Sequence, residues 1–194
     1  GFTWQYEMRR SLNTEIHLAY TLQFADATGS GAESQKGLTR LGNIRNLFPL
    51  DFDERHNISA IIDYRYDEGK RYNGPRIGGK DILANFGINL QVSAASGRPY
   101  TAKLRAERFG GSGTVGAING NRLPWRFNAD LRVDKSFAIT KKGKNPLNLN
   151  IYLRVANLLN RKNILSVYQA TGSPTDDGYL ATAEGQSIVD GLGA

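Results

Sequence analysis

The sequence predicts an all-β fold, namely an antiparallel segment of a transmembrane β-barrel that supplies about six strands to a larger barrel. Six segments alternate apolar and polar side chains with a period of two, which is typical of strands. Along the chain, the links that follow these segments alternate between short and long. The chain has no run of about 18 apolar residues, so any membrane crossing must be made by strands.

Length and composition restrict the class of protein further. The 194 residues suit one domain, and we expect residues 1–194 to belong to a single β-barrel domain. The lack of cysteine excludes disulfides, Cys-ligated metals and thiol nucleophiles, and 40% apolar residues exclude a disordered chain. The first residues lack the basic and apolar regions of a signal peptide, so we expect a mature chain or a piece of a longer one.

Each expected strand has its apolar side chains at either even-numbered or odd-numbered positions. In the first four, the apolar side chains occupy even-numbered positions, and in the last two they occupy odd-numbered positions. Each expected strand is longer than the common globular length of about five or six residues and suits a tilted path through a bilayer. The six ranges are near 2–10, 14–26, 56–67, 83–95, 125–137 and 147–158.

The two faces of these strands differ sharply in charge. The apolar face has 29 positions and no charged residue, whereas the opposite face has ten, five acidic and five basic. A water-filled or plugged lumen tolerates such a balanced lining, because opposite charges pair across neighbouring strands. We therefore expect the following polar-face residues to line the lumen and face the plug: Glu7, Arg9, Glu15, His17, Asp63, Arg65, Arg126, Asp130, Arg132, Asp134 and Arg154.

The links alternate in length along the chain. Three shorter links are expected at 11–13, 67–81 and 138–146, and three long ones, rich in Gly, Ser, Asn and Thr, at 27–54, 96–124 and 159–194. Outer-membrane barrels show this pattern, with short periplasmic turns and long outer loops. The pattern therefore favours a bacterial outer-membrane location, with outer-membrane lipid as a partner.

Aromatic side chains near the ends of the apolar rows favour the same interpretation. Amphipathic rings suit the headgroup level of a bilayer. The expected interface residues are Trp4, Tyr6, Tyr64, Tyr66 and Trp125. The alternative is a soluble or surface-displayed all-β binding module, in which the apolar rows pack against a second layer.

Motifs for chemistry are weak, and we expect no enzyme, no cofactor and no metal. The segment GPRIGGK at 74–80 has the spacing of a P-loop, but Asp81 replaces the required Ser or Thr and a strand follows instead of a helix. His56 and Ser59 are three residues apart on a strand and point to opposite faces, so an outer-membrane barrel enzyme is only a weaker alternative. Aromatic and charged residues occupy opposite faces, which argues against nucleic-acid binding.

Two acidic clusters are the remaining candidates for ion binding. Residues Asp51, Asp53 and Glu54 form the first, and Asp176 and Asp177 form the second. Carboxylates in an outer loop are able to hold calcium, but neither cluster has the EF-hand spacing. Capping of turns by Asp is therefore the expected role.

Several short segments, taken in order, resemble the C-terminal part of the barrel in TonB-dependent outer-membrane receptors. The similarity is to the Oar-like group of the Bacteroidota type, whose members have a carboxypeptidase-regulatory-like domain. The matching segments are DFDERHN at 51–57, YNGP at 72–75, NFG at 85–87, SGRPY at 96–100, RLPW at 122–125, DLRVDK at 130–135, VANLLN at 155–160 and ATGSPTDDGY at 170–179.

This resemblance implies a barrel of roughly 22 strands, of which the chain supplies six. It also implies that the plug domain and the final strand are absent from these residues. The implied partners are the remainder of the barrel, the plug, TonB acting through the absent N-terminal part, and other outer-membrane proteins. The expected function is energised uptake of a substrate that the sequence does not identify.

Overall fold

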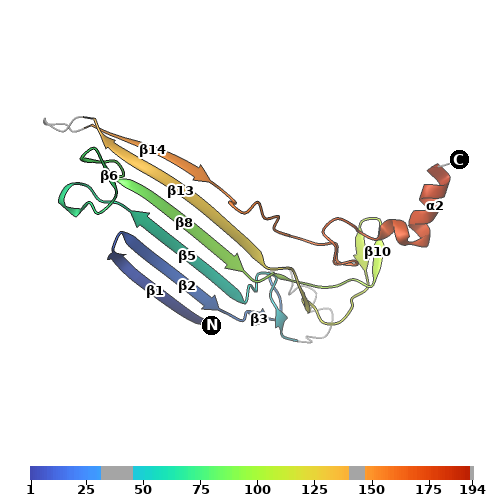
Figure 1. The fold of residues 1–194 in the computed structure, drawn as a ribbon. Helices are drawn as coiled ribbons and strands as arrows, with labels where there is room; N and C mark the ends of the chain where they lie inside the picture. The colour runs from blue at the N-terminus through green and yellow to red at the C-terminus, as the bar shows by residue number, and fades with distance from the viewer. Residues whose placement is uncertain (32–45, 140–146, 193–194) are drawn as a thin grey trace.

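Six strands pair in chain order into one antiparallel sheet (Figure 1). This computed structural model describes residues 1–31, 46–139 and 147–192. The strands of the sheet are β1 (Phe2–Ser11), β2 (Thr14–Leu22), β5 (His56–Arg65), β8 (Phe86–Ala95), β13 (Arg126–Ala138) and β14 (Asn148–Val155). Each lies within four residues of the range expected from the alternation, and the prediction of an all-β fold is confirmed. The sheet is open and is not closed into a barrel.

The register keeps the two faces separate across the whole sheet. Directly paired residues lie on the same face of an antiparallel sheet, and apolar residues pair with apolar residues at almost every step. A slip of one residue at any pair would move a whole strand to the wrong face. One straight row across all six strands consists of Met8, Ile16, Ile62, Leu90, Leu131 and Val155.

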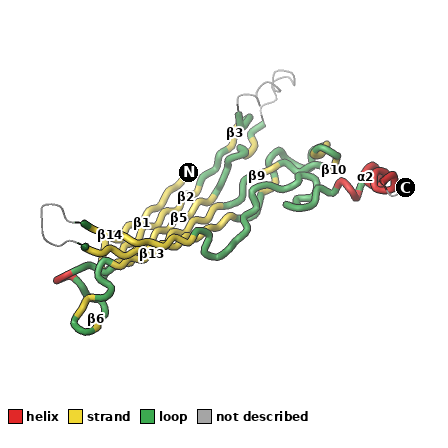
Figure 2. The backbone as a smooth tube through the Cα atoms, turned by 90° about the horizontal axis from the view of Figure 1, so that it is seen from above, coloured by secondary structure: helices red, strands yellow, loops and turns green. Residues whose placement is uncertain are grey.

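The apolar face has no second layer over it among the described residues. Ile151 is 57% exposed and Leu153 is 66% exposed, although both lie in the middle of β14. The buried residues with apolar or aromatic side chains in the described part of the chain are Tyr72, Pro99, Ala129 and Tyr179, and of these Ala129 alone lies in a strand of the six-stranded sheet. Figure 2 shows the strands as a single layer with loops at both ends. The described residues therefore lack the packed core of a soluble sandwich.

The strands are staggered at the edge where the long loops begin. Val155 at the end of β14 lies level with Met8 in β1, through the row of paired residues that crosses the sheet. However, β1 begins at Phe2, six residues before that level. From β14 to β1, across five inter-strand spacings, the edge of the sheet is therefore displaced by six residues along the strand direction.

The opposite edge is staggered in the same direction. Ser11 at the end of β1 lies level with Leu153, whereas β14 begins at Asn148, five residues beyond that level. A shift of five to six residues at about 3.3 Å each, over five strand steps of about 4.8 Å, corresponds to a strand tilt of roughly 35 to 40°.

The links on the short-link side are mostly compact. Leu12 and Asn13 form a two-residue turn with positive φ angles of 47° and 74°. The link from 66 to 85 holds a short 3-10 turn, η1 (Gly69–Arg71), and a small hairpin of β6 (Arg76–Ile77) and β7 (Lys80–Asp81). The expected link at 138–146 lies mostly outside the described residues. The P-loop-like segment is therefore a hairpin turn, as its sequence context indicates.

The long links contain small elements of their own. They hold β3 (Asp26–Ala27), β4 (Phe48–Pro49), β9 (Pro99–Tyr100), β10 (Arg105–Glu107), β11 (Gly110–Ser112) and β12 (Asn121–Arg122). The last link also has a 3-10 turn, η2 (Tyr179–Ala181), and a helix, α2 (Ala183–Leu192), which the sequence analysis did not predict. The Thr182 hydroxyl accepts a hydrogen bond from the Gly185 N–H at 3.1 Å and caps this helix.

No helix in the described ranges combines the length and apolar character needed to span a membrane.

Candidate functional site on the polar face and its loop edge

The polar face of the sheet carries a network of ion pairs near the short-link side. The Arg65 guanidinium donates two hydrogen bonds of 2.9 Å to the two carboxylate oxygens of Asp134, which is 5% exposed. The two residues belong to β5 and β13, and Gly87 of β8 lies between them in the same row. A Cβ atom at position 87 would lie 2.5 Å from the Arg65 Nη2 atom. Glycine therefore allows the arginine to cross a whole strand.

A second group of charges surrounds Asp63. Its carboxylate accepts a hydrogen bond of 3.0 Å from Arg10, which also lies 3.5 Å from Glu15. If the alternation of β1 continued past Met8, Arg10 would lie on the apolar face, but in the structure its side chain reaches Asp63 and Glu15. The register of β1 shifts between Met8 and Ser11, and the extra residue of this bulge turns Arg10 toward the polar face.

Asp130 organises the end of β14. Its carboxylate accepts hydrogen bonds from Asn128 at 2.8 Å, from Arg154 at 3.1 Å and from the backbone N–H of Asn157 at 2.9 Å. A single carboxylate thus joins one polar side chain of its own strand to the neighbouring strand and to the loop that follows. The guanidinium carbon of Arg132 lies 4.8 Å from the ring centroid of Tyr152, also on this face.

The remaining lumen-lining candidates form a looser arrangement. His17 and Glu15 are joined at 2.9 Å on the polar face, and Glu7 lies directly opposite His17. Arg9 forms no ion pair with any residue in the described ranges. Arg126 turns toward the loop edge and pairs with Glu54. The structure therefore gathers the predicted residues on one face but divides them between the sheet network and the loop edge.

The loop edge is held together by a buried carboxylate. Asp53 is fully buried and pairs with Arg122, and it also accepts a hydrogen bond of 3.0 Å from the Ala25 N–H. Burial acts to raise the pKa of Asp53, but the hydrogen bonds from Arg122 and Ala25 outweigh it and hold the pKa below its ordinary value. Arg55 adds a more distant contact at 3.5 Å.

Glu54 and Gly97 complete this cluster. Glu54 pairs with Arg98 at 2.7 Å and with Arg126. Gly97 packs so closely on the next loop that a Cβ atom there would lie 1.6 Å from the Leu123 carbonyl oxygen. Three segments far apart in the sequence, 51–57, 96–100 and 122–125, thus meet at one edge of the sheet. Each of these segments is recognisable in the sequence as a motif, but the spacing between them gives no sign that they touch.

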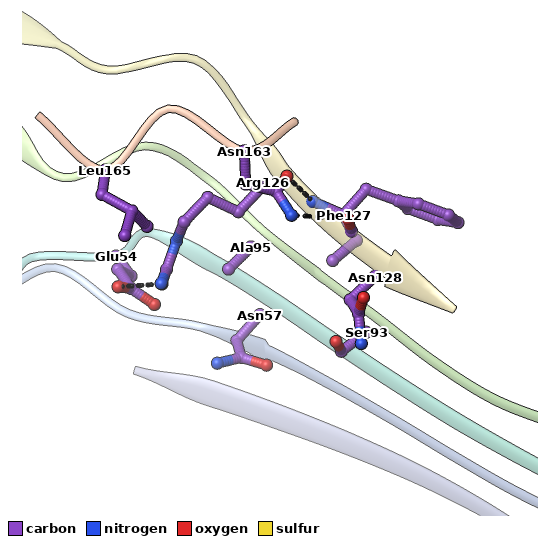
Figure 3. A pocket seen from close by; sticks show the side chains of 10 residues that line it. Glu54, Asn57, Ser93, Ala95, Arg126, Phe127, Asn128, Asn163 and Leu165 are labelled. Atoms are coloured by element: carbon purple, nitrogen blue, oxygen red, sulfur yellow. Dashed lines mark hydrogen bonds and ion pairs between the residues drawn. The ribbon is translucent and has the colours of Figure 1, made fainter. Parts of the chain in front are cut away.

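A cavity of about 300 Å³ lies on the polar face beside this cluster (Figure 3). Asn57, Ser93 and Asn128 supply neutral polar groups to its wall, and the Glu54–Arg126 pair lies at its side. Leu165 and Asn163 come from the last long link and lie over the same opening. The cavity therefore lies where the sheet meets the long link that follows β14.

Most of the predicted interface aromatics lie at strand ends on the apolar face. Trp125 directly precedes β13 and stacks on His56 at 5.5 Å between ring centroids, and Tyr64 meets Tyr66 edge-on at 5.3 Å at the other end of the sheet. Trp4 stacks on Tyr6 at 6.3 Å. Tyr6 differs from the expectation, because it lies in the middle of β1 opposite Leu18.

Among the described residues, the structure shows no histidine placed to activate a serine for hydrolysis and no cluster of side chains that could hold a metal ion. His56 Nδ1 is hydrogen-bonded to the Tyr20 hydroxyl at 2.8 Å, while Ser59 lies on the other face opposite Ala19. No group of three or more potential metal ligands gathers in the part of the chain that the structure describes. The carboxylates of Asp53 and Glu54, which were candidates for calcium, are engaged by arginines instead.

Comparison of the chain with protein-family models, with curated proteins and with solved structures gave no match.

Proposed function

We propose that this chain is a wall segment of a transmembrane β-barrel in a bacterial outer membrane. The observation that supports the proposal best is the continuous apolar face, which lies uncovered in a single layer of the described residues. Apolar side chains left in water across six strands would be a strong aggregation hazard. Contact with hydrocarbon removes that cost, since lipid replaces the missing second layer.

The stagger of the strands supports the same proposal. The offsets along the two edges correspond to a tilt of roughly 35 to 40°, and strands of closed barrels tilt by about 35 to 45°. An open edge in hydrocarbon leaves backbone groups unsatisfied at several kcal/mol each. The outer edges of β1 and β14 therefore require further strands, which the rest of the barrel supplies.

The polar face of the sheet has the charged side chains expected of a surface that lines the lumen. Most of its charged side chains are paired with opposite charges, as in the Arg65–Asp134 pair, and such a face tolerates contact with water or with a plug. Resemblance to TonB-dependent receptors extends the proposal from a barrel to a transporter. In that reading, substrate meets the outer loops and the cavity beside Glu54 and Arg126, and TonB supplies force through a plug.

Spin labels test the barrel proposal directly. The chain has no cysteine, so once any cysteine in the rest of the intact protein is replaced, Leu131→Cys and Arg132→Cys each give a unique label. In the intact protein embedded in its membrane, we expect the label at 131 to collide with dissolved oxygen, which concentrates in lipid. The label at 132 should instead collide with a water-soluble nickel complex. A label at 131 that is shielded from both reagents would indicate a packed protein core and would overturn the proposal.

A separate experiment tests the transporter part. The periplasmic domain of TonB is mixed with the intact protein in detergent, and we expect the two to co-purify. If TonB does not bind while the spin labels alternate as expected, the barrel proposal stands and the TonB-dependent mechanism does not.

A further inference from the structure

Two cations rest on phenylalanines of the apolar face, near opposite ends of β13. The guanidinium carbon of Arg161 lies 6.0 Å from the ring centroid of Phe127, and the Lys135 Nζ atom lies 5.2 Å from that of Phe137. Phe127 pairs with Ala94, so its ring belongs to the apolar face, as does the ring of Phe137. Both cations therefore lie against the face that we assign to lipid.

Arg161 is held in place by its surroundings. Its N–H donates to the Asn157 side chain at 3.0 Å, and its guanidinium donates to the Trp125 carbonyl at 3.3 Å. Asn163 fixes the same loop, because its amide pairs with both the N–H and the carbonyl of Phe127 at 2.9 Å. The side chain of Asn163 thus occupies the free edge of β13 as a neighbouring strand would.

Neither cation has an acidic partner within the described residues. Arg161 and Lys135 take part in no ion pair there, whereas the arginines of the sheet network and the loop edge do. The side chain of Arg161 is exposed, and Trp125 beside it is 47% exposed. A guanidinium at a lipid boundary needs a counter-charge, and phosphate matches its planar set of donors.

The spacing of the two phenylalanine rings that the cations contact fits the thickness of a membrane. Phe127 and Phe137 are ten residues apart on β13, or roughly 33 Å along the strand at about 3.3 Å per residue. With a strand tilt of roughly 35 to 40°, this becomes about 25 to 27 Å along the membrane normal. The apolar band of outer-membrane barrels is about 25 Å tall. The two rings would therefore lie near the two headgroup levels, with the Arg161 guanidinium carbon 6.0 Å from one ring centroid and the Lys135 Nζ atom 5.2 Å from the other.

We propose that Arg161 binds the phosphate of an anionic phospholipid headgroup at the loop edge of the apolar face, with Lys135 at the opposite headgroup level. The proposal rests on the proposed function, because it takes the apolar face to be in lipid. Phe127 and the Trp125 carbonyl orient the guanidinium, and the phosphate supplies the missing negative charge. This assigns a lipid-binding role to a residue outside the polar-face network.

Flotation with vesicles tests the inference. The protein is mixed with vesicles of phosphatidylcholine alone or with added phosphatidylglycerol, and the bound fraction is measured. Removal of one interfacial charge in Arg161→Gln should weaken binding to the anionic vesicles by about fivefold and leave binding to phosphatidylcholine unchanged. Arg108→Gln is the matched control, because Arg108 lies 5.3 Å from the ring centroid of Phe109 in a loop away from the sheet.

The outcomes separate the two proposals. Equal losses in Arg161→Gln and Arg108→Gln, or equal binding of the native protein to both kinds of vesicle, would overturn the headgroup site and leave the barrel proposal intact. Failure of the native protein to float with either vesicle would overturn the barrel proposal itself. Arg161→Lys keeps the charge but loses the paired donors, so we expect an intermediate loss. Matching circular dichroism spectra show that each variant has folded.

Discussion

Arg65 and Asp134 are joined by two hydrogen bonds of 2.9 Å although a complete strand, β8, lies between their own strands. The contact is possible because Gly87, level with both, has no side chain in the path of the guanidinium. The pair therefore fastens three strands together on the polar face. Among the ion pairs of the sheet it is the strongest candidate for a contribution to stability, since Asp134 is almost completely buried.

Gly87→Ala should weaken this pair. Its new Cβ atom would lie 2.5 Å from the Arg65 Nη2 atom, so the guanidinium must move away and Asp134 loses at least part of its partner. A buried charge that loses its hydrogen bonds costs about 1.5 to 3 kcal/mol. Urea unfolding in vesicles measures the loss. In an Asp134→Asn background, Gly87→Ala should cost much less, and an unchanged cost would show that the pair is not the cause.

The assignment of faces predicts opposite results at two adjacent positions. Leu131→Arg places a charge on the lipid side in the middle row of the sheet and should destabilise the inserted protein by about 2 to 4 kcal/mol. Arg132→Leu changes only the lumen side and should cost far less. The free energy of unfolding in vesicles is the measurement. Equal tolerance of both substitutions would mean that the faces are wrongly assigned.

Arg10 should matter more than Arg9, although strict alternation favours Arg9 as the polar-face residue. Arg10 lies 3.0 Å from Asp63, whereas Arg9 forms no ion pair with any described residue. Because Arg10 is partly exposed, Arg10→Gln should cost only about 0.2 to 1 kcal/mol. Arg9→Gln serves as the control and should have a smaller effect on the urea midpoint. The reverse order would argue against the bulge in β1.

The loop cluster should loosen in acid through Asp53. Its pKa is lower in the folded protein than the ordinary value of about 3.9, so its stabilising effect is complete above that value and is lost as the pH falls through the folded pKa. Asp53→Asn removes this dependence and should leave the protein less stable by about 1.5 to 3 kcal/mol at neutral pH. Unfolding midpoints at about pH 6 and about pH 3 should differ less in Asp53→Asn than in the native protein.

Gly97→Ala should separate the loop segments that meet at the sheet edge. Its Cβ atom would lie 1.6 Å from a backbone oxygen of Leu123, so the two loops must move apart at a cost of about 1 to 3 kcal/mol or more. Limited proteolysis should then cut the loops faster. Gly191→Ala in α2 is the control, because a Cβ atom there meets no other atom within 4 Å and alanine favours a helix. Equal protease resistance in both variants would contradict the tight contact.

Several elements of the fold follow from local sequence alone. The period of two locates all six strands of the sheet, since neighbouring side chains on a strand must point to opposite faces. The helix α2 was missed, although Thr182 supplies a suitable cap, because its short segment of Gly, Ser and Asp has only weak helical character. The bulge that redirects Arg10 was missed for a different reason. Alternation has no means of showing an extra residue at the end of a strand.

Outside the bulge that redirects Arg10, the sequence by itself determined which side chains share a face, because there the face depends only on the alternation along each strand. Tertiary structure decided which of them meet, since register brings Arg65 over Gly87 to Asp134 and loop packing brings Asp53 to Arg122. It also decided that no described residue covers the apolar face. Such facts depend on contacts between residues far apart in the chain, and a local pattern carries no information about distances across strands.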